Sequence, residues 1–243
     1  MLEDSLIEDT NPTYAAAAVT DVGRVRASNQ DCHALRTDIG VWVVADGMGG
    51  YRDGDVASRM VCEVVQSLAN YATLEDTIDA LRERMSGVNR RLHQAALRPV
   101  DPVVSGSTVV MLVTRRTSCA VLWAGDSRIY RLRDGSLARM TTDHTHAAEL
   151  ETRGVEVEEE IDYAITRAVG GEETLLLDVR LDRVQLKDRY LICSDGLTHE
   201  IGDKQIAALL AKGTVEECAK GLLEATLATE ARDNVTVVVV DAV

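Results

Sequence analysis

The sequence predicts an α+β fold built on antiparallel sheets. Short runs rich in Val, Ile, Leu and Thr have the composition of strands, and longer stretches repeat apolar residues every three or four positions, as helices do. The order is strands, two consecutive long helices, several strands, two more helices and a last strand. Consecutive helices, and strand-like runs joined only by 115–117, fit hairpins better than a parallel series of strand–helix–strand units.

In order along the chain, the predicted strands are 14–20, 41–45, 107–114, 118–124, 128–132, 184–193 and 234–241. The predicted helices are 55–71, 74–97, 203–211 and 214–229. The last helix begins at Thr214, with Glu217 at the spacing of a capping box. Between 140 and 180 the pattern dissolves into the Glu-rich stretch "ELETRGVEVEEEID", which is either a surface loop or a lid over a site.

Composition and charge narrow the classes of function. The chain has 243 residues, of which 46% are hydrophobic, so it is long enough to bury a core. Its 26 Lys and Arg against 40 Asp and Glu give a net charge of −14, which disfavours nucleic acid or an anionic membrane as the main partner. The three prolines and the lack of a Gly/Ser-rich linker favour one compact domain.

The N-terminus and the cysteines bear on localisation. "MLEDSLIEDT" has no basic segment followed by a long apolar one, so we expect no signal peptide, and no apolar run is long enough to span a membrane. The five cysteines are far apart, without a CxxC pair. We therefore expect a cytoplasmic protein, and we expect it to be a monomer.

Several aspartates stand at the ends of apolar runs. They occur in "VWVVADGMGG" (41–50), "VLWAGDSR" (121–128), "YLICSDG" (190–196) and "RDNVTVV" (232–238), and Asp31 stands in "VRASNQDC". Each alone reads as a turn aspartate that bonds its own backbone. If the strand ends converge at one edge of a sheet sandwich, several carboxylates meet, and such like charges cannot all stay ionised without cations.

The types of residue near these strand ends indicate which metal ion a site there would bind. Carboxylates without a His/Cys cluster suit Mg²⁺ or Mn²⁺, whereas the scattered histidines disfavour zinc. The spacing of Asp46, Asp53 and Asp55 misses that of a calcium-binding EF-hand, and the glycines at 47–50 lack the GK[ST] of a nucleotide loop. Gly47 instead leaves room for its carbonyl to approach a cation.

A site with two such ions can hydrolyse a phosphate ester, because the ions lower the pKa of a water and neutralise charge on the phosphoryl oxygens. A phosphate also needs a cationic partner. Arg26, five residues before Asp31, is a candidate because a guanidinium holds two phosphate oxygens at once. Taken alone, Arg26 would be an ordinary surface arginine.

The chain resembles the bacterial PP2C-type (PPM) serine/threonine protein phosphatases. The resemblance runs in order from about residue 13 to residue 241, through "GRVRASNQD", "VVADGMGGYRDGDVAS", "SGST", "WAGDSRIYRLRDG", "TTDHT", "ITRAVGG", "LICSDGL" and "RDNVTVVVV". It implies a four-layer α-β-β-α sandwich of two antiparallel sheets flanked by pairs of helices. It also implies residues 1–12 as an N-terminal extension, residues 13–243 as one phosphatase domain, and a flap at about 145–170.

The resemblance also implies a role for each motif residue in a centre of two Mg²⁺ or Mn²⁺ ions. Asp46 would bridge both ions, Asp195 and Asp233 would complete one, and the Gly47 carbonyl with Asp31 would serve the other, Asp31 directly or through water. Arg26 matches the phosphate-binding arginine. Asp126 matches an aspartate that helps to hold a third, weaker metal in bacterial members.

Two positions depart from the family pattern. Eukaryotic members carry a histidine, proposed as the general acid, at the position of Met48; a methionine there is usual in bacterial members. In the flap, "EEEIDYAITRAVGG" replaces an HPxR-like segment. The predicted activity is hydrolysis of phosphoserine and phosphothreonine in proteins, in one step and opposite a cognate Ser/Thr kinase. The alternatives are a phosphoprotein-binding module that has lost activity and a hydrolase of small phosphorylated metabolites.

Overall fold

The computed structural model describes residues 11–49, 53–99, 102–154 and 164–243. One sheet has five strands in the order β1 (Tyr14–Asp21), β11 (Val235–Ala242), β10 (Arg189–Cys193), β7 (Arg128–Arg133) and β8 (Ser136–Arg139). The other has the order β2 (Asp31–Arg36), β3 (Val41–Met48), β5 (Val109–Arg115), β6 (Ser118–Ala124) and β9 (Asp178–Arg183), with β4 (Gly106–Ser107) paired to the end of β3. Every pairing is antiparallel.

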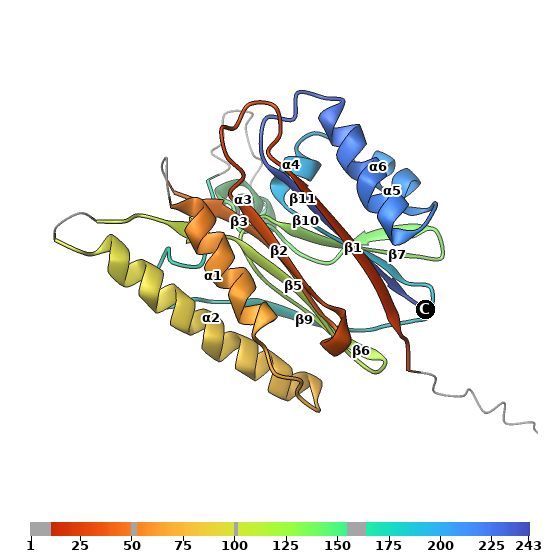
Figure 1. Cartoon of the computed structure of the whole chain (residues 1–243), viewed down its shortest axis with the longest axis horizontal. Coiled ribbons are helices and arrows are strands. Elements are labelled where there is room, and N and C mark those ends of the chain that lie inside the picture. The colour runs from red at the N-terminus through yellow and green to blue at the C-terminus, as the bar shows by residue number, and fades with distance from the viewer. Residues whose placement is uncertain (1–10, 50–52, 100–101, 155–163) are drawn as a thin grey trace, which may run out of the picture.

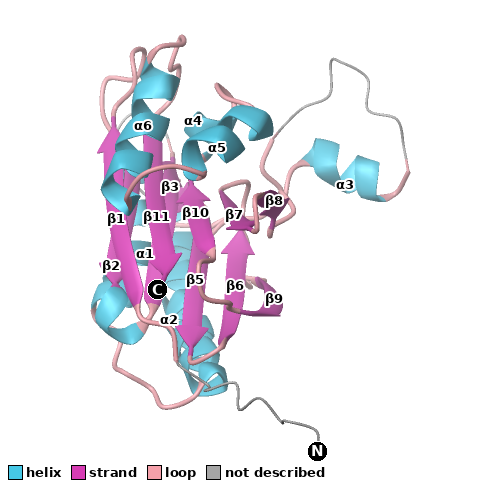
Figure 2. Cartoon of the chain, turned by 90° about the vertical axis from the view of Figure 1, so that its right-hand side faces the viewer, coloured by secondary structure: helices cyan, strands magenta, loops and turns pink. Residues whose placement is uncertain are grey.

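Helices cover the outer face of each sheet (Figure 1). On the six-stranded sheet lie α1 (Gly54–Gln66) and α2 (Leu74–Ala96), and on the five-stranded sheet lie α4 (Asp195–Thr198), α5 (Asp203–Leu210) and α6 (Val215–Leu227). The short α3 (His146–Thr152) projects from the body beyond β8 (Figure 2), and η1 (Thr37–Ile39) links β2 to β3. The predicted α+β class, with two antiparallel sheets flanked by helices, is confirmed.

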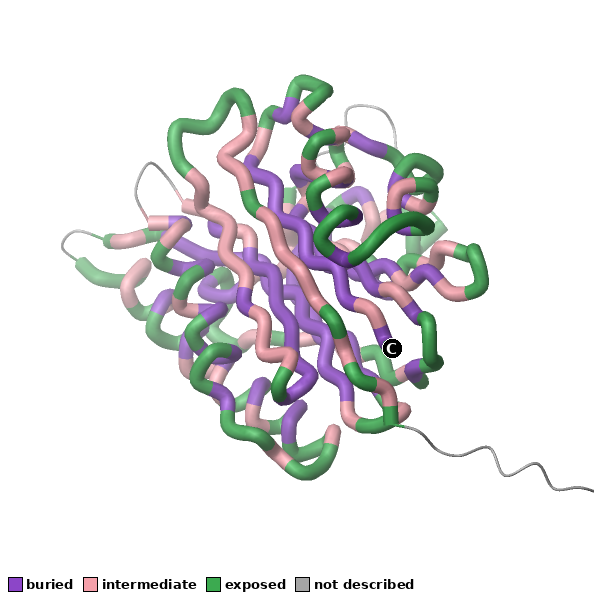
Figure 3. The backbone as a smooth tube through the Cα atoms, turned by 45° about the vertical axis from the view of Figure 1, so that its right-hand side comes forward, coloured by how far each residue is buried: buried purple, intermediate pink, exposed green. Residues whose placement is uncertain are grey.

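Three apolar layers hold these elements together, and the buried strands run through the middle of the molecule (Figure 3). The layer under α1 and α2 contains Val61, Leu81, Met85, Val43 and Met111. The layer between the two sheets contains Trp42, Leu112, Tyr190 and Val238. The layer under α5 and α6 contains Leu191, Val237, Ile206 and Leu222. Because both faces of the central strands are buried, β3, β5, β10 and β11 read as continuous apolar runs.

The helix starts follow ordinary capping chemistry. The Thr73 hydroxyl accepts a hydrogen bond of 3.0 Å from the backbone N–H of Asp76 at the start of α2. The predicted capping box at Thr214 is confirmed: its hydroxyl accepts from the Glu217 N–H, and the Glu217 carboxylate accepts from the Thr214 N–H. These bonds satisfy backbone donors that the first turn of a helix otherwise leaves free.

Some predicted boundaries were wrong. The strand expected at 184–193 begins at Arg189, because Gln185 donates from its N–H to the Asp188 carboxylate and closes a turn there. The helix expected at 55–71 ends at Gln66. Strands β2, β8 and β9 and helices α3 and α4 were not predicted. The flap expected at about 145–170 includes residues 155–163, which lie outside the described residues.

Candidate metal centre

Two of the predicted aspartates lie side by side on the six-stranded sheet. Strand β3 is fully buried from Val41 to Ala45, and Asp46 is its first residue that water reaches. Across the ladder, Asp46 is the register partner of Asp31 on β2. The Asp46 N–H donates to the hydroxyl of Thr108 at 2.9 Å, which fixes the end of the strand. The antiparallel pairing therefore places two carboxylates at one end of the sheet.

The other sheet contributes at the same end of the sandwich. Asp195 follows β10 as the first residue of α4, and Asp233 precedes β11, the strand paired with β10. Ser194 joins the two sheets: its hydroxyl donates to Asp31 Oδ2 at 2.7 Å and accepts from the Thr236 N–H at 2.9 Å. Asp195 and Asp233 are thereby held facing the pair formed by Asp31 and Asp46.

Asp126 lies in the turn between β6 and β7 and is 8% exposed. The turn is anchored by a hydrogen bond of 2.8 Å between the hydroxyls of Ser127 and Thr108, and Thr108 also binds the backbone of Asp46. The Asp126 carboxylate interacts electrostatically with Asp46 and Asp195. The residue that the family pattern assigns to a third metal is therefore a neighbour of the other carboxylates.

Burial and the neighbouring negative charges raise the pKa values of four of these aspartates. Loss of water around the side chain, with some repulsion from Asp195 and Asp233, raises the pKa of Asp31 to about 7. Burial, followed by the charges of Asp195 and Asp143, raises the pKa of Asp126 to about 7. Burial and then the charges of Asp31 and Asp195 raise the pKa of Asp46 well above its usual range. Burial also raises the pKa of Asp195, against the opposing influence of His199.

The carboxylate oxygens fit a cation. One oxygen each of Asp31, Asp126 and Asp195 is buried without a hydrogen-bond partner among the described residues. Burying such an oxygen costs free energy unless it accepts a hydrogen bond or binds a cation. Hard divalent cations prefer oxygen ligands of this kind. In the same ranges, no three Asp, Glu, His or Cys side chains are grouped so that they could hold a metal ion as they stand. The donor set suits Mg²⁺ or Mn²⁺, and Asp233 is turned to another partner.

That partner is Arg26. The Arg26 Nε donates to Asp233 Oδ1 at 2.8 Å and an Nη donates to Asp233 Oδ2 at 2.6 Å. The bonds to Asp233, with further attraction from Asp46 and Asp195, raise the pKa of Arg26. The predicted phosphate-binding arginine thus stands at the edge of the carboxylate cluster, although the sequence places it 207 positions from its partner.

Gly47 has a packing role in addition to the predicted one. A Cβ atom at this position would lie 2.0 Å from the carbonyl oxygen of Gly54, where α1 begins, so only glycine fits. The Gly47 N–H donates to the Gln30 carbonyl at 3.1 Å. The close approach of α1 is therefore enough to require glycine here, and binding of a metal by the Gly47 carbonyl stays a prediction.

A cleft of about 700 Å³ opens beside the carboxylates. Asp233 and Gly196 border it on the side of the centre, and His199, Glu200, Thr229 and Arg232 line it further out. The His199 ring lies 3.5 Å from Asp195 Oδ2. Sequence reasoning dismissed His199 as a scattered histidine, although its position four residues after Asp195, one helical turn away, could have indicated the contact.

The ends of the predicted flap are tied to the body. The His144 ring stacks on Trp123 and lies 3.2 Å from Asp178 Oδ2, and Arg167 donates to Asp178 Oδ1 at 2.9 Å. Further along, Ser107 and Val169 form a β-bridge. The motif residues of "TTDHT" and "ITRAVGG" therefore anchor the segments that lead into and out of α3 and residues 155–163.

A family model described as protein phosphatase 2C matches residues 23–231. The chain belongs to this family of protein phosphatases. It is 33% identical to the serine/threonine protein phosphatase PstP of Mycobacterium tuberculosis over 232 residues, which cover 93% of this chain and 45% of PstP. The chain thus spans less than half the length of that relative. It is 30% identical to the Listeria monocytogenes phosphatase stp over 235 residues, 91% of this chain and 93% of stp.

Solved structures agree with the fold. The Pseudomonas aeruginosa protein PppA, described as a key regulatory component of T6SS, superposes with a TM-score of 0.89 at 35% identity, over 96% of this chain and 99% of PppA. The catalytic domain of PstP, solved with two manganese ions, superposes with a TM-score of 0.85 at 33% identity, over 95% of this chain and 98% of that domain. Among the described helices, none is long and apolar enough to cross a bilayer.

Proposed function

We propose that this chain hydrolyses phosphoserine and phosphothreonine in proteins, at a centre of two Mg²⁺ or Mn²⁺ ions, and so reverses the action of a Ser/Thr kinase. The observation that carries the proposal is the set of facing carboxylates from both sheets. Asp31, Asp46 and Asp195 have raised pKa values, and one buried oxygen of Asp31 and one of Asp195 have no hydrogen-bond partner among the described residues. Membership of the phosphatase family, and the two manganese ions in the structure of the PstP catalytic domain, support it.

The residues of the chain have distinct tasks in this proposal. Asp46, Asp195 and Asp233 would hold one ion, and Asp46, the Gly47 carbonyl and Asp31 the other. Asp126 would help to hold a third. When bound, such ions lower the pKa of water and neutralise the charge of a phosphoryl group. Ser194 keeps Asp31 in place through its hydrogen bond.

Arg26 would bind the phosphate. Its side chain is 57% exposed, so a phosphate on a protein surface can reach it, and its planar fork suits two phosphate oxygens. Met48 carries no transferable proton, so the leaving alkoxide takes its proton from elsewhere. The cleft beside Asp233 would receive residues that flank the phosphorylated side chain.

The decisive experiment is turnover of a phosphothreonine peptide by the chain after EDTA treatment and dialysis, with and without added Mn²⁺. We expect turnover only with Mn²⁺ or Mg²⁺, and little on a matched phosphotyrosine peptide. Undiminished turnover in excess EDTA would contradict the metal centre. Turnover of small phosphorylated metabolites but not of the peptide would favour a metabolite hydrolase, and binding of the phosphopeptide without turnover would favour a binding module.

A further inference from the structure

The ion pair between Arg26 and Asp233 uses both oxygens of a carboxylate that the proposed centre needs. The two hydrogen bonds, of 2.8 Å and 2.6 Å, are parallel and join the guanidinium fork to the two carboxylate oxygens. An oxygen that accepts from a guanidinium is less available to a cation, and a positive charge beside the site repels one. Arg26 and a divalent cation therefore make competing demands on Asp233.

The backbone keeps the two residues together whichever demand prevails. Gly23 packs so tightly that a Cβ there would lie 2.2 Å from the Asp233 carbonyl oxygen, and its φ of +77° favours glycine. The Asn234 amide donates to the carbonyls of Val22 and Ser28 at 2.9 and 3.0 Å. The loop that carries Arg26 is thus fastened to the turn that carries Asp233, and a released Arg26 side chain stays beside the site.

We propose that Asp233 exchanges Arg26 for the cation, so that capture of the metal frees the guanidinium to bind the phosphate of the substrate. The inference rests on the proposed function and adds that binding of the metal releases Arg26 from Asp233. A guanidinium fork can bind either a carboxylate or a phosphate through two parallel hydrogen bonds, so the same side chain serves both partners. Arg26 is a positioning residue in the first role and a substrate ligand in the second.

The strength of the pair suits an exchange. The side chains of Arg26 and Asp233 are 57% and 32% exposed, so water screens their attraction and the pair is weak compared with a buried one. A cation bound by several carboxylates can displace it. Removal of Arg26 should therefore tighten metal binding by a modest factor, about two- to fivefold.

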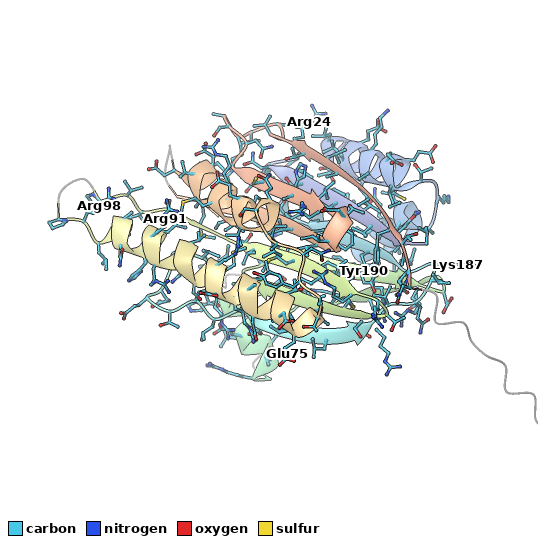
Figure 4. The ribbon with its side chains drawn as sticks, turned by 60° about the horizontal axis from the view of Figure 1, so that its bottom comes forward. Arg24, Glu75, Arg91, Arg98, Lys187 and Tyr190 are labelled. Atoms are coloured by element: carbon cyan, nitrogen blue, oxygen red, sulfur yellow. The ribbon has the colours of Figure 1, made fainter. Side chains whose placement is uncertain are left out.

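Arg24 offers a matched control. It lies on the same loop and is labelled in Figure 4, but its guanidinium binds the Leu227 carbonyl at 2.8 Å and no carboxylate among the described residues. Arg24→Gln and Arg26→Gln remove the same charge from the same loop. Only the second removes a competitor for Asp233.

The test is calorimetric titration of the metal-free chain with Mn²⁺ at one pH and ionic strength. We expect Arg26→Gln to bind Mn²⁺ about two- to fivefold more tightly than the unchanged chain and Arg24→Gln to match the unchanged chain. By thermodynamic linkage, inorganic phosphate should tighten Mn²⁺ binding more in the unchanged chain than in Arg26→Gln. Far-ultraviolet circular dichroism confirms that each variant is folded.

Equal or weaker Mn²⁺ binding by Arg26→Gln would overturn the inference, as would an equal gain in Arg24→Gln, which would indicate a general effect of charge. Equal tightening by phosphate in both proteins would also overturn it. If the unchanged chain turns over phosphopeptide with Mn²⁺ while these results appear, only the inference fails. If the unchanged chain does not bind Mn²⁺ at all, the proposed function fails with it.

Discussion

At the scale of single residues, Asp46 is the point where the negative charges of the candidate centre meet. Burial has the largest effect on the pKa of Asp46 and raises it, and the charges of Asp31, Asp195 and Asp126 raise it further. Asp46→Asn keeps the shape of the side chain but removes one of these charges. In EDTA, at a pH high enough to ionise these carboxyls, we expect the melting temperature to rise by a few degrees, about 2–6 °C, because repulsion within the cluster falls. With Mn²⁺ we expect phosphopeptide turnover to fall by about three orders of magnitude or more, because a shared metal ligand is lost.

Scanning calorimetry in EDTA and steady-state turnover with Mn²⁺ measure the two effects. Asp79→Asn, on the exposed face of α2, removes the same charge far from the cluster and should change neither quantity. Retention of a tenth of the turnover by Asp46→Asn would count against its role as a ligand. A lower melting temperature in EDTA would count against the repulsion.

The raised pKa values of Asp31 and Asp126 predict how the metal-free protein responds to pH. Both carboxyls have a pKa of about 7 in the folded state, against 3.8 ordinarily, so the folded state holds protons that the unfolded chain has released. Their contribution to stability is complete below pH 3.8 and is lost as the pH rises through about 7. In EDTA, the melting temperature should therefore fall between about pH 5 and pH 8.

Thermal melts across that range, in EDTA and in Mn²⁺, test this expectation. Mn²⁺ should remove most of the fall in melting temperature with rising pH, because a cation replaces the protons as the partner of the carboxylates. Asp126→Asn, which cannot lose a proton, should flatten the curve in EDTA. A melting temperature that does not change with pH in EDTA would mean that the carboxylates are not desolvated in the folded chain.

At the scale of elements, Asn89 connects α2 to the end of the predicted flap and to the residues that follow it. This side chain is 1% exposed; its Oδ1 accepts from the Gly170 N–H at 2.7 Å, and its amide donates to the carbonyls of Glu172 and Glu173. Asn89→Ala would leave these backbone groups without a partner, at a cost of about 1–3 kcal/mol. Chemical denaturation should show that loss, and exchange of the Gly170 amide hydrogen should become faster.

Arg90→Ala is the control, because Arg90 is the next residue of α2 and its side chain is exposed. It should leave both the free energy of unfolding and the exchange of Gly170 unchanged. If Asn89→Ala were as stable as the unchanged chain, a water would have to satisfy the groups that Asn89 binds.

The elements that were predicted well from the sequence have a strong apolar pattern, either a continuous run or a helical repeat. Strand β6 and helix α2 were predicted almost to the residue. Both faces of β6 are buried, so it reads as an apolar run, and α2 repeats apolar residues along a helix of 23 residues. Strand β9 reads "DVRLDR", at the edge of its sheet and without a buried residue, so its composition is that of a loop. Strand β2 was also missed: it lies at the other edge of that sheet, begins at Asp31 after a polar stretch, and buries only Ala34.

The site was predictable only in part. The aspartates stand out because a charge ends an apolar run, and their convergence followed from the sandwich that the family resemblance implied. Ser194 and Thr108 stand in the motifs "LICSDGL" and "SGST", but nothing local shows that their hydroxyls bind Asp31 and the backbone of Asp46, which are distant in sequence. The same holds for the pair of Arg26 and Asp233, which the loop at Gly23 brings together. Sequence patterns indicate where charges lie, but not which of them face each other.

At the scale of the whole molecule, the two ends of the described chain close one sheet. Strand β1 lies at the edge of the five-stranded sheet and pairs with β11 along its whole length. Beyond it, Thr13 and Val243 exchange two backbone hydrogen bonds of 2.9 Å. Strand β11 is almost entirely buried, so β1 covers a strand that would otherwise be an apolar edge open to water or to another chain.

This closure predicts where the domain begins. A chain that starts at Thr13 keeps the bonds to Val243 and all of β1, so we expect its melting temperature to lie within about 2 °C of the full chain and its Mn²⁺-dependent turnover to be unchanged. A chain that starts at Val22 loses β1, exposes β11 and removes a neighbour of α6, so we expect it to aggregate or to melt at least about 10 °C lower. Thermal melts, light scattering and turnover of the three chains measure these outcomes. Loss of turnover on removal of residues 1–12 alone would show that they belong to the catalytic unit, and an undisturbed melt without β1 would show that the sheet is complete at β11.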